Sequence, residues 1–488
     1  MTPTQTLPAG LGDLDSETFR RSGHQLVDWI ADYLAGGLDD RPVLAQVEPG
    51  EIRRSLPASA PEQGEPMERI LEDFERLLVP GLTQWNHPAF FAYFNSTGSA
   101  PGVLGEFLTA ALNQQAMLWR TSPAATELEE VATGWLRRLL GLPESFEGVI
   151  NDSGSSSTFH ALLAAREAAV PGVRSRGLSA RSDIPRLRVY CSELAHSSVD
   201  KALMALGIGH DALEKIPVDQ TYRLRPDALE AAIRADLAAG VLPVAVVATV
   251  GTTSAGSVDP VPAIASLCSA HKLWLHVDAC HAGTAAMLPE HASIFDGVAQ
   301  ADSVVVNPHK WMFTPMDASV LFCRRMDVLR SALALTPDYL ETREAGAVHN
   351  LMDTGIALGR RFRALKLWMV MRAFGAEGLR ARLREHIRLA HELTRWVEAD
   401  PDFELMAPTV LSLVCFRAAP RGVEASALDA LNEQLLEKVN ASGEAYLSHT
   451  RLRGRYVLRL AVGHIRTAES HVARTWTLLR ETLGVRIL

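Results

Sequence analysis

Three polar clusters in this chain contain residue types that could together hold a phosphate, a cation and an aldehyde. Residues 151–158 read NDSGSSST before a helical stretch, and backbone N–H groups and hydroxyls at a helix start bind phosphate. Asp278 ends the apolar run LWLHVD, where a buried carboxylate is costly unless it meets a cation. Lys310 in NPHKW precedes an apolar run, and partial burial would make its amine nucleophilic enough for Schiff-base chemistry.

Each cluster also has a purely structural explanation. The serines could simply cap a helix, Asp278 could form a salt bridge, and Lys310 could extend from the surface over apolar neighbours. A fourth cluster, AHSS at 195–198, places His196 after another apolar run, where a histidine is often a satisfied loop residue. Taken together, a phosphate site, a buried carboxylate, a nucleophilic lysine and an imidazole are the parts that pyridoxal 5'-phosphate (PLP) requires, so we expect that cofactor.

Two other kinds of site fit the residue spacing less well. Four residues near one another could suggest a metal site: His271, His276, Cys280 and His281. The steps of five residues between the histidines match neither strand nor helix geometry, so we expect no metal. Ser198 and Lys201 match the S-x-x-K pattern of a serine hydrolase, but neither KTG nor G-x-S-x-G occurs in the sequence.

The segments around these clusters alternate between short apolar runs and longer helical stretches. Between about residues 100 and 370, the apolar runs are 148–150, 189–190, 244–250, 273–277, 303–306 and 319–322. This alternation predicts an α/β domain with a mainly parallel sheet, in which ligands bind at the carboxyl ends of the strands. Every polar cluster lies at or just after one of these runs, so we expect the clusters to meet at that edge.

The two ends of the chain predict two further parts. Residues 1–98 contain helical stretches separated by proline-rich segments, and we expect a helical arm that packs against the main domain or a second subunit. Residues 99–370 form the predicted cofactor domain. Residues 371–488 mix helical stretches, at about 378–399 and 425–441, with strand-like runs, which predicts a small α+β domain.

Composition narrows the class of protein further. The 488 residues include 48 Lys and Arg against 57 Asp and Glu, and this net charge of −9 disfavours nucleic acid or an anionic membrane as a partner. Five cysteines without a CxxC pair favour a reducing, cytoplasmic location over a disulfide scaffold. The uncharged stretch 237–258 is long enough to span a membrane, but its apolar part is short and bounded by Pro and Gly, so we predict a buried strand.

Nearly the whole sequence resembles the group II PLP-dependent decarboxylases of fold type I, and most of all the aromatic-L-amino-acid decarboxylases. The resemblance is carried by HPAFFAYF (87–94), TSPAATELE (121–129), AHSSVDKA (195–202), GTTSAGSVD (251–259), HVDACHAG (276–283), NPHKW (307–311) and LGRRFRALKLW (358–368). It implies a fold-type I PLP-dependent transferase fold and a homodimer whose subunits share their active sites. The implied reaction converts an aromatic L-amino acid into the corresponding arylalkylamine and CO2.

The resemblance also implies a role for each matching residue. Lys310 binds PLP through a Schiff base, Asp278 pairs with the pyridinium nitrogen, and His196 stacks on the ring. The other cofactor-binding residues are Gly154, Ser155, Thr253, Asn307 and His309. The substrate pocket is lined by Trp85, Tyr93, Phe94, Met117, Leu351 and Gly359, with the segment around Met117 reaching into the neighbouring subunit's site.

The sequence departs from this family at the residue that should return a proton to the substrate. In the family a tyrosine on a mobile loop protonates the α carbon, but Leu351 stands where we expect it, and Tyr339 lies well upstream. Either His349, His196 or water donates the proton, or protonation is poor and oxygen intercepts the reaction. The second outcome would give an aromatic aldehyde, ammonia and peroxide instead of the amine.

The pocket residues depart from the family as well. Met117-Leu118 replaces the expected Phe-Ser, and Cys280-His281 replaces the usual Ala-Tyr. These changes keep a large, mainly apolar pocket, which favours an aromatic side chain over glutamate. A protein that binds PLP without catalysis is the alternative from another functional class, and it is disfavoured by three retained residues: Lys310, Asp278 and His196.

Overall fold

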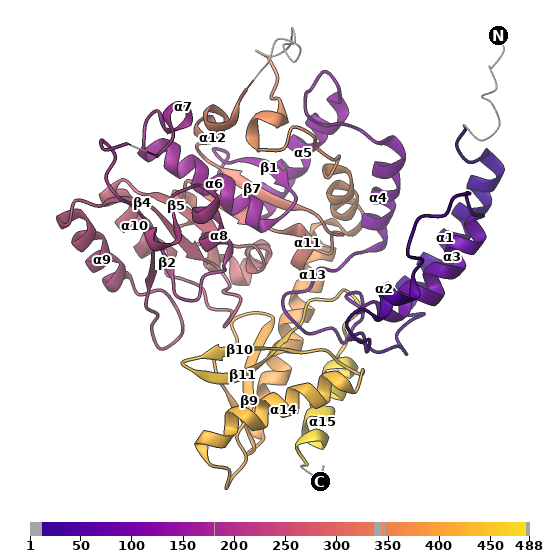
Figure 1. The fold of residues 1–488 in the computed structure, drawn as a ribbon. Coiled ribbons are helices and arrows are strands. Elements are labelled where there is room, and N and C mark those ends of the chain that lie inside the picture. The colour runs from indigo at the N-terminus through magenta and orange to yellow at the C-terminus, as the bar shows by residue number, and fades with distance from the viewer. Residues whose placement is uncertain (1–11, 180, 336–343, 345–346, 485–488) are drawn as a thin grey trace, which may run out of the picture.

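The computed structural model describes residues 12–179, 181–335, 344 and 347–484. Figure 1 shows an α/β core with a helical arm on one side and a second, smaller sheet below it. The predicted fold class is therefore confirmed. None of the described helices is both long and apolar enough to cross a membrane, and residues 242–249 of the uncharged stretch form a buried strand.

The N-terminal arm consists of α1 (Ser16–Ala35), α2 (Glu51–Ser55) and α3 (Met67–Asp73). The side chain of Asp15 accepts hydrogen bonds from the backbone N–H groups of Glu17 and Thr18, which caps α1. Gly36 ends this helix with φ at 108°, a left-handed conformation that suits glycine. The arm folds back on itself, because the Trp29 ring of α1 packs edge-on against Phe74 just beyond α3, with ring centres 5.2 Å apart.

Among the described residues, seven strands form the central sheet in the order β1-β7-β6-β5-β4-β2-β3. They are β1 (Glu147–Asn151), β2 (Leu187–Ser192), β3 (Leu213–Ile216), β4 (Leu242–Thr249), β5 (Trp274–Asp278), β6 (Ser303–Val306) and β7 (Ser319–Cys323). Only β7 runs antiparallel to its neighbours β1 and β6, so the sheet is mainly parallel, as predicted. The short strand β3, which is only partly buried, was absent from the predicted runs because it lacks their apolar residues.

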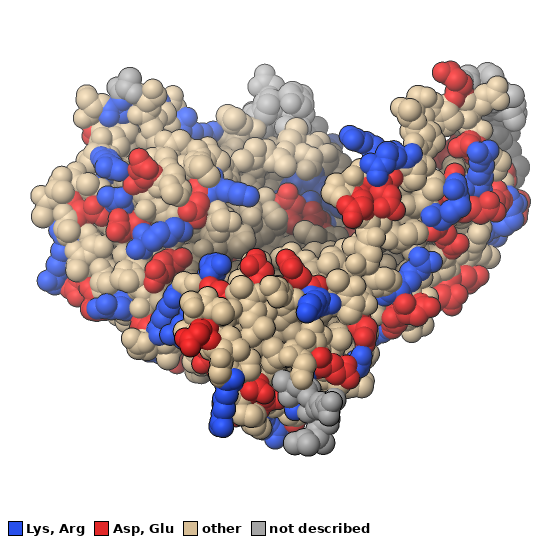
Figure 2. Space-filling view, turned by 60° about the horizontal axis from the view of Figure 1, so that its bottom comes forward, with Lys and Arg blue, Asp and Glu red and all other residues tan. Residues whose placement is uncertain are grey.

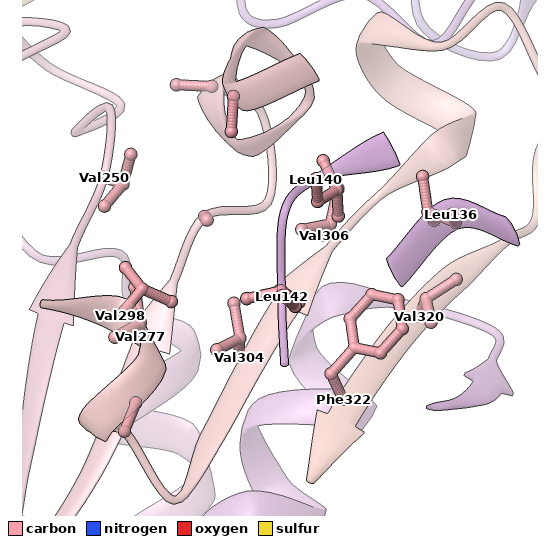
Figure 3. Packing of buried hydrophobic residues seen from close by; sticks show 14 of the residues in the cluster. Leu136, Leu140, Leu142, Val250, Val277, Val298, Val304, Val306, Val320 and Phe322 are labelled. Atoms are coloured by element: carbon pink, nitrogen blue, oxygen red, sulfur yellow. The ribbon is translucent and has the colours of Figure 1, made fainter. Parts of the chain in front are cut away.

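Helices cover both faces of this sheet. Its strands are therefore buried on both sides and carry apolar residues on both. Along β4, Val246 and Ala248 pack into one core, while Ala245 and Val247 pack into the core on the opposite face. Figure 3 shows part of the first core, where Leu136 of α5 lies near Val320 of β7. Burying a side chain of this size fully contributes about 1.5–3 kcal/mol, so these cores hold the strand ends in place.

The helices around the sheet are α4 (Ala100–Leu112), α5 (Pro123–Leu139), α6 (Gly154–Ala169), α7 (Val173–Arg176), α8 (Ser198–Ala205), α9 (Pro226–Ala238), α10 (Val261–His271), α11 (Pro308–Trp311) and α12 (Met326–Leu333). Shorter helical turns are η1 (Phe74–Leu78), η2 (Val79–Gly81), η3 (His210–Ala212), η4 (Ala282–Met287), η5 (Pro289–Phe295), η6 (Val298–Gln300), η8 (Leu351–Thr354) and η9 (Ala425–Ala427). Helices α6, α8 and α12 lie on one face, and α5, α9 and α10 lie on the other.

The C-terminal part contains an antiparallel sheet in the order β10-β11-β9-β8. Its strands are β8 (Phe403–Leu405), β9 (Leu413–Ala418), β10 (Ser448–Leu452) and β11 (Arg455–Ala461), and its helices are α14 (Leu428–Ala441) and α15 (Glu469–Leu483). The long α13 (Ala364–Ala399) links this part to the central sheet and is kinked at Gly375, where φ is 62°. The predicted boundary at 370 falls within the first section of α13, and the domain limits 1–98, 99–370 and 371–488 remain predictions.

Candidate active site

A cavity of about 210 Å³ lies at the carboxyl ends of the parallel strands. All eight residues predicted to bind the cofactor line it: Gly154, Ser155, His196, Thr253, Asp278, Asn307, His309 and Lys310. The pairing of β4 with β5 sets Thr249 opposite Asp278, so both strands end at the same level. The sheet therefore brings together side chains that the sequence places more than a hundred residues apart.

The start of α6 forms one wall of the cavity. Ser153 caps this helix, and its hydroxyl accepts a hydrogen bond from the backbone N–H of Ser156 at 3.2 Å. Gly154 leaves no room for a side chain, because a Cβ atom there would lie 2.7 Å from Cys280 Sγ and 2.9 Å from Asn307 Nδ2. The backbone at the start of α6 therefore lies directly against the cavity, in an arrangement that suits a phosphate group.

Asp278 lies on the wall formed by the end of β5, and only 6% of it is exposed. One oxygen accepts a hydrogen bond from the backbone N–H of Cys280 at 3.1 Å. Among the described residues, no lysine, arginine or histidine nitrogen lies within 4.0 Å of this carboxylate. A buried carboxylate without a protein cation suits a ligand that carries a positive charge.

Lys310 and two histidines complete the polar walls. Lys310 belongs to α11, directly after β6, and its Nζ lies 5.9 Å from the centre of the Phe94 ring. His309 Nδ1 accepts a hydrogen bond from the backbone N–H of Ala318 at 2.9 Å, and burial lowers the pKa of His309 to about 4. His196 Nδ1 accepts from the backbone N–H of Ser198 at 3.1 Å, and partial burial lowers the pKa of His196.

Several buried polar atoms of the cavity wall have no hydrogen-bond partner among the described residues: Thr249 Oγ1, His281 Nδ1 and Asn307 Oδ1. Buried polar groups are almost always satisfied in folded proteins, so three such atoms in one cavity indicate a polar ligand. The donor set matches PLP in particular. A helix start suits its phosphate, an unpaired carboxylate suits its ring nitrogen, and a lysine suits its aldehyde.

Four aromatic rings form a stack that begins at the cavity and runs away from it. The ring of His281 is parallel to that of Phe94 at 3.7 Å and to that of Trp311 at 4.9 Å. Trp311 Nε1 donates a hydrogen bond to His386 Nδ1 at 2.9 Å, and these two rings are nearly parallel as well. The stack holds Phe94 and His281 in fixed positions beside Lys310.

Arg459 is a residue of this region that sequence reasoning missed. It is 3% exposed, and its Nη1 donates a hydrogen bond to Ser448 Oγ at 2.7 Å. Its Nε and Nη2 have no partner among the described residues, and Cζ lies 5.4 Å from the centre of the Phe94 ring. The sequence feature that could have revealed Arg459 is a charged residue inside the otherwise apolar run RYVLRLA. In the structure, the last six residues of this strand are all buried.

The predicted substrate-pocket residues are divided between two places. Phe94 lines the Lys310 cavity, whereas Tyr93 and Trp85 lie outside it with their rings stacked 6.0 Å apart. The Tyr93 hydroxyl is 3.0 Å from that of Tyr446, and 47% of Tyr93 is exposed. Tyr93 also has a φ of 56°, which is rare for a residue other than glycine and typical of functional sites.

Four other predicted residues lie outside the Lys310 cavity of their own chain. Met117 O accepts a hydrogen bond from the Met352 N–H at 3.0 Å, and Leu351 is 5% exposed. Gly359 lines an adjoining cavity of about 660 Å³. The Nδ1 atom of His349 lies 3.5 Å from Glu130 Oε1, on a half-exposed side chain. Tyr339 lies outside the described residues.

Comparisons with known proteins agree with this geometry. A family model described as the pyridoxal-dependent decarboxylase conserved domain matches residues 49–419. Phenylacetaldehyde synthase of Arabidopsis thaliana is 42% identical over 96% of this chain and 97% of its own length, and tyrosine decarboxylase 2 of the same plant is 41% identical over 96% and 87%. The crystal structure of Oryza sativa TDC with PLP and tryptamine superposes with a TM-score of 0.93 at 37% identity, covering 97% of this chain and 99% of that one.

Proposed function

We propose that this chain decarboxylates an aromatic L-amino acid to the corresponding arylalkylamine. The chain belongs to the pyridoxal-dependent decarboxylase family and is a PLP-dependent carboxy-lyase. The observation that carries this proposal is the cavity shared by Lys310, Asp278 and the start of α6. Its lysine and carboxylate lack partners of opposite charge among the described residues, which supports a reactive site rather than a structural one. The unpaired Lys310 and Asp278 also disfavour a protein that binds PLP without catalysis.

Some residues of the cavity would bind the cofactor, and others would stabilise its charge. Lys310 supplies the amine that would hold PLP covalently, and Ser155, Asn307 and His309 would hold the phosphate. Asp278 would keep the ring nitrogen protonated. When bound, PLP supplies a cationic ring that takes up the electron pair of the carbon–carbon bond that breaks. His196, with its pKa lowered by partial burial, would cover the ring as a neutral imidazole.

Arg459 is the residue best suited to the carboxylate of the substrate. The Nε and Nη2 atoms of its buried guanidinium have no hydrogen-bond partner among the described residues, and a carboxylate can accept hydrogen bonds from both. The ring of Phe94 lies near both cations, with Lys310 Nζ 5.9 Å and Arg459 Cζ 5.4 Å from its centre. An α-amino acid could therefore place its amine at Lys310 and its carboxylate at Arg459.

An aromatic substrate is supported by the aromatic side chains at the cavity wall and next to it. Phe94 lines the cavity, and the adjacent Tyr93 lies outside it, stacked on Trp85 and with its hydroxyl 3.0 Å from that of Tyr446. Such rings bind an aromatic side chain by stacking and by apolar burial. Relatives of this chain are named for tyrosine decarboxylation and for phenylacetaldehyde synthesis, and both names refer to a compound with an aromatic ring.

A second product remains a candidate because of Leu351. Leucine carries no proton that it can donate, and a named aldehyde synthase is 42% identical to this chain. Without protonation at the α carbon, the reaction would consume O2 and water and give an aldehyde, CO2, ammonia and hydrogen peroxide. The two outcomes release the same amount of CO2 and differ only in the later fate of the α carbon.

We also propose that the active unit is a cytoplasmic homodimer. Three leucines on one stripe of α4, Leu104, Leu108 and Leu112, are each about half exposed, and Phe19 of α1 is 67% exposed. An exposed apolar stripe such as the one on α4 marks an interface. Met117 and Leu351 lie outside the cavity of their own chain, which supports a role in the site of a partner subunit. The five cysteines are all free, as suits a reducing compartment.

The test of this function combines colour with product analysis. The purified protein should be yellow with bound PLP, and Lys310→Ala should lose that absorbance. A panel of aromatic amino acids is then assayed for CO2, amine, aldehyde and peroxide separately. A wild-type protein that stays colourless after incubation with PLP, or that releases no CO2 from any member of the panel, contradicts the proposal.

A further inference from the structure

We propose that His281 is the catalytic residue that returns a proton to the α carbon of the substrate after CO2 leaves. This inference rests on the proposed decarboxylation and on Arg459 as the carboxylate-binding residue. Leu351 lacks a proton to give, and its segment is held away from the cavity, because its carbonyl oxygen accepts a hydrogen bond from Arg360 at 2.8 Å. His349 faces Glu130 instead of the cavity. A donor must therefore come from the cavity wall or from solvent.

His281 is held rigidly in that wall. Its ring is parallel to Phe94 within 7° and to Trp311 within 8°, so the imidazole cannot turn over without breaking both stacks. Nε2 lies 3.3 Å from Ser412 Oγ, while Nδ1 is buried without a partner among the described residues. An orphaned imidazole nitrogen costs free energy in a purely structural histidine. Its presence beside Lys310 indicates a group that acts on a ligand.

The substrate's α carbon would lie next to this imidazole. The Phe94 ring, which is 3.7 Å from the His281 ring, has Lys310 Nζ at 5.9 Å and Arg459 Cζ at 5.4 Å from its centre. Amine and carboxylate of an α-amino acid are attached to one carbon. A substrate with its amine at Lys310 and its carboxylate at Arg459 therefore brings that carbon to the Phe94–His281 pair.

The charges around His281 set its pKa, and this pKa changes when the substrate binds and when CO2 leaves. Burial lowers the pKa of His281 well below its usual value, and Lys310, Arg459 and His386 lower it further, so the free imidazole is neutral. A bound carboxylate offsets the charge of Arg459 and raises the pKa of His281, which favours uptake of a proton. CO2 leaves as a neutral molecule, so Arg459 regains its full charge at the stage where the α carbon must accept a proton.

The step balances in atoms and electrons. The bond between the α carbon and the carboxyl carbon breaks, and its electron pair, which the ring of bound PLP would take up, ends in a new C–H bond at the α carbon. The N–H bond of His281 breaks in the same step, and the imidazole recovers a proton from solvent. In sum, one amino-acid carboxylate and one proton give one amine and one CO2.

The first experiment measures amine formed per CO2 released with the PLP-loaded enzyme. His281→Phe keeps a flat ring between Phe94 and Trp311, and the ratio should fall about a hundredfold while CO2 release changes about threefold or less. The missing amine should appear as aldehyde and peroxide. The matched control is His449→Phe, which replaces an exposed histidine that stacks on Tyr456 outside the cavity and should keep the wild-type ratio.

The outcomes separate this inference from the proposed function. An unchanged ratio in His281→Phe, or a wild type that already forms only aldehyde, overturns the role of His281 while decarboxylation stands. The absence of CO2 from every aromatic amino acid refutes the decarboxylation itself, and the role of His281 with it.

A second measurement follows the imidazole without turnover. In ¹⁵N NMR of the PLP-loaded protein labelled in histidine, the His281 resonances are identified by their loss in His281→Phe. At pH 7 they should move toward the protonated range when 3-phenylpropionate binds, and the neutral 3-phenylpropionamide should leave them unchanged. Resonances that stay neutral with the carboxylate, or that shift equally with the amide, contradict the proposed coupling to Arg459.

Discussion

Arg360 and Glu129 form a buried ion pair in which Arg360 Nη2 donates a hydrogen bond to Glu129 Oε1 at 2.9 Å. Their side chains are 8% and 3% exposed. Glu129 of α5 also accepts a hydrogen bond from the backbone N–H of Ile150 in β1, and Arg360 donates to the carbonyl oxygens of Ile150 and Leu351. The pair therefore ties the segment before α13 to the edge of the central sheet and to η8.

Breaking this pair should destabilise the fold strongly. Glu129→Gln leaves the Arg360 charge buried without a counter-charge, and the free energy of unfolding should fall by about 3–5 kcal/mol. Urea denaturation followed by circular dichroism measures the change. Glu17→Gln, which breaks an exposed pair with Arg20, serves as the control and should leave the denaturation midpoint unchanged. Equal midpoints for both variants would contradict the importance of the buried pair.

Gly154→Ala should weaken PLP binding without unfolding the protein. The added Cβ would lie 2.7 Å from Cys280 Sγ and 2.9 Å from Asn307 Nδ2, so the start of α6 must shift out of the cavity. We expect the Kd for PLP to rise about tenfold or more, equivalent to about 1.4 kcal/mol. Titration of the cofactor-free protein by absorbance measures it. Cys280→Ala added to this variant should recover part of the affinity, because it removes the nearest atom.

The control for this variant is Gly23→Ala, where a Cβ atom would meet nothing within 4 Å. It should bind PLP as tightly as the wild type does. A Gly154→Ala protein that binds PLP with unchanged affinity would show that the start of α6 does not hold the phosphate.

Arg459→Met should remove the preference of the site for a carboxylate. The wild-type holoenzyme should bind 3-phenylpropionate about a hundredfold more tightly than 3-phenylpropionamide, because Arg459 Nε and Nη2 have no hydrogen-bond partner in the described part of the chain and can both donate to an anion. In Arg459→Met the two affinities should become similar. Arg451→Gln, at an exposed pair with Asp429, is the control and should keep the preference. Competition measurements on both variants decide whether Arg459 binds the carboxylate.

Asp259 should give the protein a pH-dependent stability. Burial raises the pKa of Asp259 from 3.8 to about 6, against hydrogen bonds from the backbone N–H groups of Leu224 and Thr249 that lower it. Between these two values the unfolded chain has released a proton that the folded chain keeps, so stability falls as pH rises from about 4 to about 6. The loss is at most about 3 kcal/mol.

Asp259→Asn isolates this contribution, since other titrating groups are common to both proteins. The stability advantage of the wild type over Asp259→Asn, measured by urea denaturation at pH 4.5, 5.5 and 6.5, should shrink steadily as pH rises. An advantage that is constant or growing across this range would mean that the N–H groups outweigh burial and that the carboxylate is ionised throughout.

Patterns confined to a few residues predicted the parts of the site that lie within one element. Asp278 ends β5, Ser153 caps α6, and Lys310 directly follows β6. Alternation, capping and turn chemistry act over a few positions, so they can be recognised in a sequence. Parallel strands end at a common edge, and for this reason eight predicted residues share one cavity.

On the face of the molecule in Figure 2, the charged side chains do not gather by sign. Figure 2 shows basic and acidic side chains interspersed over a hollowed face of the molecule, with no large area of one sign. The net charge of −9 was known from composition, but the distribution of charge over the surface depends on how the elements pack.

The sequence by itself determined the fold class, the strand-end clusters and the glycine that lies against the cavity. Only the tertiary structure decided which groups stand unpaired beside Lys310. Arg459 on β11 meets Phe94 from the N-terminal segment, and His281 is enclosed between Phe94 and Trp311. Such contacts join segments that are far apart along the chain. Their geometry follows from the packing of whole elements, and residue spacing within one segment carries no information about it.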